Sequence, residues 1–172
     1  MKVVRYYKSY IHLSKKFNSG HIVLDSFIKS EKSTDSAYGV TYIWLNESED
    51  EIIGYYCISA GTFDYKENET RIKQCGAAHI DYFAIDEKYQ GVKYEDDKYE
   101  YKLSDLLLLD CLNRINVIRH CIGIGCVTLS STEQGYNLYK RADFEETDLD
   151  TCFSDTEGEK KTTDMYLFLD QE

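Results

Sequence analysis

The sequence contains no proline, no Cys-x-x-Cys pair and no apolar run long enough to cross a membrane. The leucine run at residues 106–109 is far shorter than the roughly 20 residues that span a bilayer. The first ten residues are polar and charged, so we expect no signal peptide. These absences predict a cytoplasmic protein without a membrane partner.

The cysteines and histidines show no spacing typical of a metal site. The six cysteines lie far apart or in apolar runs, which favours buried free thiols in a reducing compartment. The four histidines, His12, His21, His79 and His120, are scattered, so neither a zinc set nor a Cys-His couple is expected. We therefore predict no metal cofactor.

Positive charge is scarce, and tyrosine is abundant. The 20 Lys and Arg residues against 31 Asp and Glu leave a net charge of −11, which argues against general nucleic-acid binding. An acidic chain attracts cationic substrates such as amines, although acidity also serves solubility. The 16 tyrosines suit half-buried strands or, alternatively, a tyrosine-lined ligand groove.

The length of 172 residues and the element pattern predict one domain covering residues 1–172. Segments 62–74 and 147–161 are interpreted as charged loops. The pattern is that of an α/β fold, with a single mixed, mostly antiparallel sheet flanked by helices. Strands are expected at residues 3–13, 38–45, 52–59, 77–85, 126–129 and 163–169, and helices after the turn at 17–20, at 105–119 and at 133–141.

Two helices carry an apolar face in the sequence. Ser104 is a suitable N-cap for the helix 105–119, because its hydroxyl can accept a hydrogen bond from a backbone N–H group of the first turn. The expected apolar faces are Leu108, Leu109, Leu112 and Ile115 on this helix, and Ile22, Val23, Phe27 and Ile28 on the helix after residue 20.

Two motifs in the second half of the chain resemble the GNAT superfamily of N-acetyltransferases. Residues 80–91, which read Phe-Ala-Ile-Asp and then Tyr-Gln-Gly, are similar to its central strand and the opening of its acetyl-CoA loop. The sequence Leu138-Tyr139 followed by Phe144 is similar to its tyrosine-bearing helix. In the first half, residues 17–20, 24–28 and 54–61 resemble the branch that includes the toxins of toxin–antitoxin pairs.

The resemblance implies the acyl-CoA N-acyltransferase fold and an activity. A primary amine would attack the acetyl-CoA thioester directly, and the hydroxyl of Tyr139 would protonate the departing thiolate as the general acid. The pyrophosphate would bind backbone N–H groups at a helix start. The implied cofactor-binding residues are Phe83, Ala84, Ile85, Gln90, Gly91, Lys102, Leu103, Ser104 and Asp105.

The chain departs from the family pattern at the phosphate loop and after the tyrosine. Gln90 and Gly91 are present, but residues from 92 onward look like an insertion, and Ser104 stands in the place of the last glycine. Lys102 can supply positive charge, whereas Asp105 would oppose a phosphate. Asp143 stands where the family prefers glycine, and aspartate tolerates a left-handed conformation.

Alternatives stay open for each residue and for the function. Tyr139 could be a packed aromatic, while Asp81 and His79 are weak candidates for a general base. Besides an N-acetyltransferase acting on a small-molecule or peptide amine, we consider a toxin that acetylates aminoacyl-tRNA and a non-catalytic GNAT-like binding module. The family often dimerises, so a homodimer is compatible with the sequence.

Overall fold

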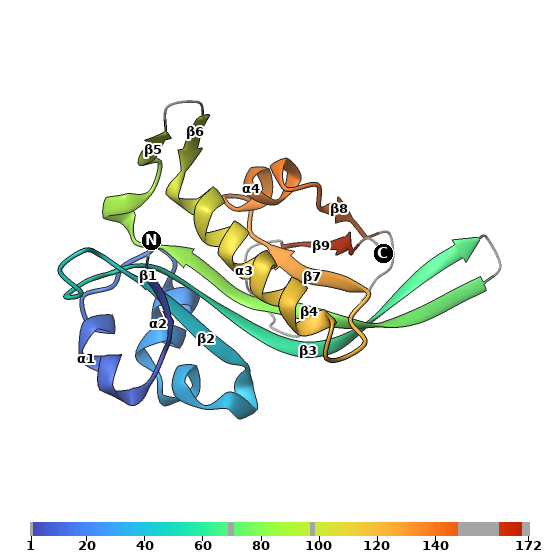
Figure 1. The fold of residues 1–172 in the computed structure, drawn as a ribbon, viewed down its shortest axis with the longest axis horizontal. Helices are drawn as coiled ribbons and strands as arrows, with labels where there is room; N and C mark the ends of the chain where they lie inside the picture. Colours follow the sequence, from blue (N-terminus) through green and yellow to red (C-terminus); the bar gives the residue numbers. More distant parts are fainter. Residues whose placement is uncertain (1, 69–70, 97–98, 148–161, 170–172) are drawn as a thin grey trace. The chain divides into compact units, whose positions relative to one another are not determined.

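The computed structural model describes residues 2–68, 71–96, 99–147 and 162–169 (Figure 1). The predicted acidic loop at 147–161 therefore lies almost entirely outside the described residues. The strands are β1 (Lys2–Arg5), β2 (Val40–Leu45), β3 (Ile52–Asn68), β4 (Arg71–Ile85), β5 (Lys93–Asp96), β6 (Tyr99–Lys102), β7 (Cys126–Ser131), β8 (Glu145–Glu146) and β9 (Thr163–Phe168). The helices are α1 (Ile11–Ser14), α2 (Ile22–Lys29), α3 (Leu103–Arg119) and α4 (Tyr136–Arg141), with short 3-10 turns η1 (Lys8–Tyr10), η2 (Glu31–Thr34), η3 (Ser36–Tyr38) and η4 (Glu87–Tyr89).

One sheet contains seven of the strands, in the order β1-β2-β3-β4-β7-β9-β8, and β5 pairs with β6 separately. The β1–β2, β2–β3, β7–β9 and β8–β9 pairs are antiparallel, while β4 and β7 are parallel. The predicted mixed, mostly antiparallel sheet with flanking helices is confirmed. The chain divides into two compact units, Met1–Ser59 with Asp81–Arg114 and Ala60–Ile80 with Ile115–Glu172.

In the first unit, two adjacent tyrosines of β3 show which helix covers which face of the sheet. Successive strand residues point to opposite faces. The Tyr55 hydroxyl donates to the Leu24 carbonyl in α2 at 2.7 Å, whereas the Tyr56 hydroxyl donates to the Asp110 carboxylate in α3 at 2.5 Å. The two helices therefore lie on opposite faces, and each is tied to the sheet by a buried tyrosine.

The apolar core on the α2 side of this unit joins the N-terminal segments to the sheet. Phe17 packs edge-on against Tyr55, with ring centroids 5.4 Å apart, and Phe27 stacks on Tyr82 at 3.7 Å. Burial of such rings is the main source of stability for this layer. The buried members are Tyr6, Leu13, Phe17, Phe27, Ile28, Ile43, Leu45, Ile52, Tyr55, Cys57 and Ala84.

The strand predicted at residues 3–13 is only partly correct, because β1 ends at Arg5. Tyr6 still pairs through its N–H with the Thr41 carbonyl at 2.8 Å, but the chain then turns into η1 and α1. Leu13 and Phe17 are buried in the same cluster as Tyr6. Leu13 lies seven residues after Tyr6, and this odd spacing would put the two side chains on opposite faces of a strand, whereas the turn into η1 and α1 lets both enter the core.

The expected apolar face of α2 is corrected at its first residue. Phe27 and Ile28 are buried, whereas Ile22 is 80% exposed. Asp25 closes the start of the helix, because its carboxylate accepts hydrogen bonds from the Ser19 hydroxyl at 2.7 Å and the Ser19 N–H at 2.8 Å. These bonds hold the chain just before α2 and leave Ile22 on the solvent side of the first turn.

Two corrections concern α3. The helix begins at Leu103, so Ser104 lies inside its first turn and is not the N-cap. Leu107 and Leu108 are buried, but Leu109, expected in the apolar face, is 53% exposed. The run of four leucines masked the helical phase, since every residue in it is apolar.

In the second unit, the loop predicted at 62–74 is wrong for its described residues, because β3 extends to Asn68 and β4 begins at Arg71, and the two form a ribbon. Phe63 is buried, and its ring stacks on Tyr166 of β9 with centroids 4.9 Å apart. Tyr65 and Phe168 complete this aromatic cluster, edge to face at 5.0 Å. Because a two-stranded ribbon is only marginally stable alone, the stacked rings supply the packing that keeps it extended.

The segment from Gly123 to Gly125 brings two backbones into close contact. The Gly125 N–H donates to the Gly76 carbonyl at 2.8 Å. A Cβ atom on Gly76 would lie 2.1 Å from the Gly123 carbonyl oxygen, so only glycine fits at this position. The turn between α3 and β7 thereby lies directly against β4.

Candidate functional site

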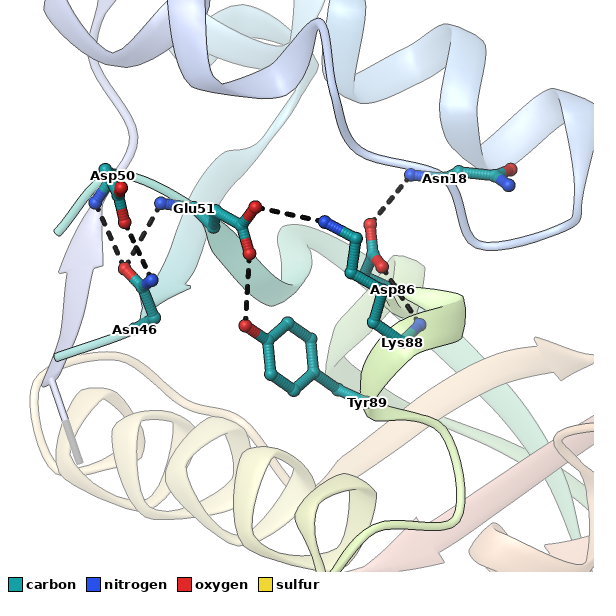
Figure 2. A network of polar contacts seen from close by, with 7 residues as sticks. All are labelled: Asn18, Asn46, Asp50, Glu51, Asp86, Lys88 and Tyr89. Carbon is teal, nitrogen blue, oxygen red and sulfur yellow. Dashed lines mark hydrogen bonds and ion pairs between the residues drawn. The ribbon is translucent and has the colours of Figure 1, made fainter. Parts of the chain in front are cut away.

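The end of β4 leads into a loop held by one buried carboxylate (Figure 2). Asp86 is only 4% exposed, and it accepts hydrogen bonds from the Asn18 N–H at 2.9 Å and the Lys88 N–H at 3.1 Å. In return, the Glu87 N–H donates to the Asn18 carbonyl at 2.8 Å. Asp86 is therefore the cap of η4, and it ties the loop after β4 to the turn before α2.

A second set of polar contacts holds the other side of η4 (Figure 2). Glu51 accepts from the Lys88 ammonium at 3.0 Å and from the Tyr89 hydroxyl at 3.2 Å. The hydrogen bond and charge of Lys88 lower the pKa of Glu51, and the same contacts raise the pKa of Lys88. Asn46 fixes the turn that carries Glu51, because its side-chain oxygen accepts from the N–H groups of Asp50 at 3.0 Å and Glu51 at 3.2 Å.

Gln90, expected to contact a cofactor, uses its side chain within the protein. Its amide nitrogen donates to the carbonyls of Ser19 and Ile85, both at 2.9 Å. Gly91 follows with a φ of +73°, a left-handed conformation that favours glycine. The pair positions the loop: Gln90 joins its two ends, and Gly91 turns the chain outward into β5.

The insertion expected from residue 92 onward forms the hairpin β5–β6, which ends where α3 begins. The Leu103 N–H donates to the Val92 carbonyl at 3.1 Å and closes the base of the hairpin. The Asp105 carboxylate accepts from the Lys102 N–H at 3.0 Å. Asp105 therefore performs the capping function that we assigned to Ser104, in the manner of the reciprocal half of a capping box.

This arrangement changes what the start of α3 offers to an anion. A free helix N-terminus presents unsatisfied N–H groups and a partial positive charge. Here the N–H groups of Lys102 and Leu103 are already engaged, and Asp105 adds a carboxylate. A phosphate at this position would therefore have fewer backbone donors than at an open helix start.

The end of β4 can offer a ligand mainly its backbone. Ala84 and Ile85 are 4% and 6% exposed, and Phe83 is half-buried. A Cβ atom on Gly54 would lie 2.8 Å from the Ala84 carbonyl oxygen, so β3 approaches this segment closely. The parallel ladder with β7 covers Ala77–Ile80, and β4 continues beyond it to Ile85.

In the second unit, Tyr139 lies at the C-terminal end of α4 and is 6% exposed. The Phe144 N–H donates to the Tyr139 carbonyl at 3.1 Å, and the Asp143 N–H donates to the Lys140 carbonyl at 3.3 Å. Asp143 has a φ of +62°, so these bonds form a Schellman motif. The rings of Tyr139 and Phe144 meet edge to face at 5.6 Å, which supplies the apolar contact of that motif.

The spacing of Tyr139, Asp143 and Phe144 thus has a structural cause as well as a proposed chemical one. Asp143 adopts the left-handed conformation that aspartate tolerates. The motif fixes the tyrosine ring between Phe144 and Gly135, where an added Cβ would lie 3.2 Å from the Tyr139 ring. A ring held in this way is preorganised, whether it packs or reacts.

Of the weaker candidates, His79 has a clear structural partner. Its Nδ1 atom lies 2.8 Å from the Thr128 hydroxyl across the β4–β7 ladder. Within the described ranges, no three His, Cys, Asp or Glu side chains gather as a metal site would require. None of the described helices is both long and apolar enough to cross a bilayer.

Sequence reasoning missed the two acidic residues that hold the loop, Asp86 and Glu51. Their partners lie 68 and 37 residues away along the chain. One local signal was present, because an aspartate directly after a buried strand, followed by a short polar segment, is typical of a capped turn. The pairing of Glu51 with Lys88 leaves no such signal.

Comparisons with known proteins support the fold. No family model matches the sequence. The probable toxin TacT of Sinorhizobium fredii is 28% identical over 127 residues, covering 69% of this chain and 65% of that relative. The chain thus spans slightly less than two thirds of the length of this curated relative.

Two solved structures of the toxin AtaT are also similar. One is a tyrosine-to-phenylalanine mutant bound to the C-terminus of the antitoxin AtaR and to acetyl-CoA; it has a TM-score of 0.70 at 16% identity and covers 97% of this chain and 92% of its own. The other is AtaT complexed with acetyl-methionyl-tRNAfMet, with a TM-score of 0.72 at 15% identity and coverage of 97% and 94%. The predicted GNAT-like fold is confirmed, and the chain is similar to the toxin TacT in sequence and to the toxin AtaT in architecture.

Proposed function

We propose that this chain is an acetyl-CoA-dependent N-acetyltransferase. Direct attack by a primary amine on the thioester would transfer the acetyl group, with Tyr139 as the general acid. The observation that carries the proposal is the ordered loop after β4. Asp86 caps this loop, and the long helix α3 begins after it at Leu103. This strand–loop–helix unit occurs in a fold shared with a toxin solved with acetyl-CoA.

Backbone groups of β4 and the start of α3 would hold the cofactor. Phe83, Ala84 and Ile85 lie beyond the ladder with β7, so the β7-side edge of this segment would face the pantetheine amides, with the Ile85 carbonyl already accepting from Gln90. Ser104 and Asp105 follow the two engaged N–H groups in the first turn of α3, and Lys102 is exposed beside them. The negative charge of Asp105 would oppose the pyrophosphate, and the positive charge of Lys102 would compensate for it.

Tyr139 would protonate the sulfur as the carbon–sulfur bond breaks. A phenol hydroxyl needs only hydrogen-bond distance to the departing thiolate, and burial keeps water from competing for that contact. The attacking amine loses a proton to solvent or to a base, and the products are the amide and free CoA. The structurally similar toxin AtaT was solved as a tyrosine-to-phenylalanine mutant, which is the type of substitution that tests such a role.

The test is a matched pair of tyrosine variants on α4. Tyr139→Phe keeps the ring that packs on Phe144 and removes only the hydroxyl, while Tyr136→Phe on the same helix is the control. We expect Tyr139→Phe to lower turnover about 100-fold or more, as loss of a general acid does, with acetyl-CoA binding unchanged. Calorimetry measures binding, and chromatography measures free CoA formed with a panel of amines.

Three outcomes contradict parts of this proposal. Full turnover by Tyr139→Phe would remove the role of the hydroxyl. Absence of acetyl-CoA binding by the wild-type protein would remove the function itself. Binding of acetyl-CoA without turnover on any amine would instead favour the non-catalytic GNAT-like module.

A second candidate acceptor is aminoacyl-tRNA, as in a toxin. Residues 2–34 contain seven Lys or Arg residues against two Asp or Glu, although the whole chain has a net charge of −11. All seven cations are exposed, on β1, η1, α2, η2 and the segment after α1. A local excess of positive charge is what docking of a polyanion requires.

This candidate is tested with charge reversal at two neighbouring lysines. Lys15→Glu with Lys16→Glu should weaken RNA binding and flatten its salt dependence, while leaving acetyl-CoA binding intact. A matched reversal at Lys140 and Arg141, on α4 of the second unit, is the control. If charged initiator tRNA remains unacetylated and expression leaves growth unaffected, a different amine is the acceptor.

A further inference from the structure

The hairpin β5–β6 carries an exposed apolar face. Tyr94 and Tyr101 are directly opposite each other in its ladder, so their side chains lie on the same face. Val92 lies two residues before Tyr94 and shares its side of the chain. All three residues are exposed to solvent: Tyr94 by 56%, Tyr101 by 40% and Val92 by 43%.

The position of this face is defined by its attachments. The hairpin begins directly after Gly91 and Val92, and its last residue, Lys102, is bonded through its N–H to Asp105 in the first turn of α3. The Leu103 N–H bonds to the Val92 carbonyl, which holds the base of the hairpin against the helix start. Whatever binds at the start of α3 therefore lies next to the tyrosine face.

From this juxtaposition we propose that Tyr94 and Tyr101 form a stacking platform for the adenine ring of acetyl-CoA. The proposal rests on the function proposed above. A purine is planar and apolar on both faces, and it stacks favourably on exposed aromatic side chains. With phosphates at the start of α3, the attached adenosine would lie within reach of the hairpin.

The altered phosphate loop supplies a reason for such a platform. The N–H groups of Lys102 and Leu103 are already engaged, and Asp105 places a negative charge in the first turn. Affinity lost at the phosphates must be recovered elsewhere if the cofactor is to bind. The opposite face of the same ladder carries Lys93 facing Lys102, so positive charge lies at the base of the hairpin, where α3 begins.

The experiment compares two ligands on the full chain. Acetyl-CoA contains the adenine nucleotide, whereas S-acetylpantetheine lacks it and retains the thioester. Tyr94→Ala with Tyr101→Ala removes both rings, Tyr94→Phe with Tyr101→Phe keeps them, and Tyr38→Ala removes an equally exposed tyrosine elsewhere. Calorimetry gives each affinity, and proton NMR follows the adenine H2 and H8 signals, which a stacked ring shifts upfield.

We expect the double alanine variant to bind acetyl-CoA about 10- to 100-fold more weakly and to bind S-acetylpantetheine as the wild type does. The double phenylalanine variant should retain affinity and the upfield shifts, and Tyr38→Ala should behave as the wild type.

Equal affinity of the alanine variant and wild type for acetyl-CoA overturns the platform but leaves the proposed function standing. An equal loss for both ligands shows that the hairpin acts through folding and also overturns it. Weakened RNA binding with unchanged acetyl-CoA binding would assign the face to RNA instead. If the wild-type protein binds no acetyl-CoA, both proposals fall together.

Discussion

Replacement of Asp86 by alanine should destabilise the protein through one identifiable loop. The substitution removes a buried carboxylate that accepts hydrogen bonds from the N–H groups of Asn18 and Lys88. Hydrogen bonds to charged groups contribute about 1.5–3 kcal/mol each. Asn18 and Lys88 are themselves exposed, so water can partly replace the lost acceptor. We therefore expect Asp86→Ala to lower the free energy of unfolding by about 2–4 kcal/mol.

Urea unfolding followed by circular dichroism measures this change, and a chain of this size should lose roughly 5–15 °C in melting temperature. Asp86→Asn keeps one acceptor oxygen, so its loss should be smaller. Asp50→Ala, at an exposed turn in the same network, should stay within about 0.5 kcal/mol. A loss below about 0.5 kcal/mol for Asp86→Ala would refute the capping role. Weaker acetyl-CoA binding by folded Asp86→Ala would connect the cap to the cofactor loop.

Three further outcomes are expected. The pKa of the Glu51 carboxyl lies below its usual range, mainly because of Lys88 and also because of the Tyr89 hydroxyl. Its stabilising contribution is present at neutral pH and is lost as the pH falls through that lowered pKa; an NMR titration should show this, and Lys88→Met should reduce the shift. Asp143→Gly should raise unfolding stability by about 0.5–1 kcal/mol, because glycine adopts the observed left-handed conformation without strain, and an unchanged or lower denaturation midpoint would contradict that reasoning. Iodoacetamide mapping should label exposed Cys121 in the folded protein and Cys57 only after unfolding, since burial raises the pKa of Cys57 to about 12.

The parts of the fold that could be predicted from the sequence are those with a strong local pattern. The end of β4 at Ile85 and the end of α3 at Arg119 agree with the expected boundaries, because a buried strand and a long helix both bury residues at regular intervals. The ribbon at the ends of β3 and β4 was missed, since both of its faces carry polar residues. The alternating aromatics Phe63 and Tyr65 were the available signal.

For the candidate site, the sequence predicted which segments contribute residues, but not what each side chain does there. Gln90 was expected at a cofactor but bonds to Ser19 and Ile85, and the helix cap is Asp105 rather than Ser104. The role of Gln90 was missed because its partner Ser19 is distant in the sequence. The cap was misassigned because the sequence does not show which of the adjacent residues Ser104 and Asp105 reaches the backbone N–H of Lys102. Tyr139 was located on a short helix as predicted, and its role stays a prediction.

The division of the chain into two units limits where the protein can be truncated, cleaved or recombined. The chain passes between the units after Ser59, after Ile80 and after Arg114, which are positions inside β3, β4 and α3 rather than in connecting loops. Neither unit is a continuous piece of sequence, so neither can be expressed alone by truncation, and a protease finds hydrogen-bonded backbone at each crossing. Gene fusion or exchange at these points would cut through a strand or a helix. Insertions at these three crossings should therefore disrupt the fold.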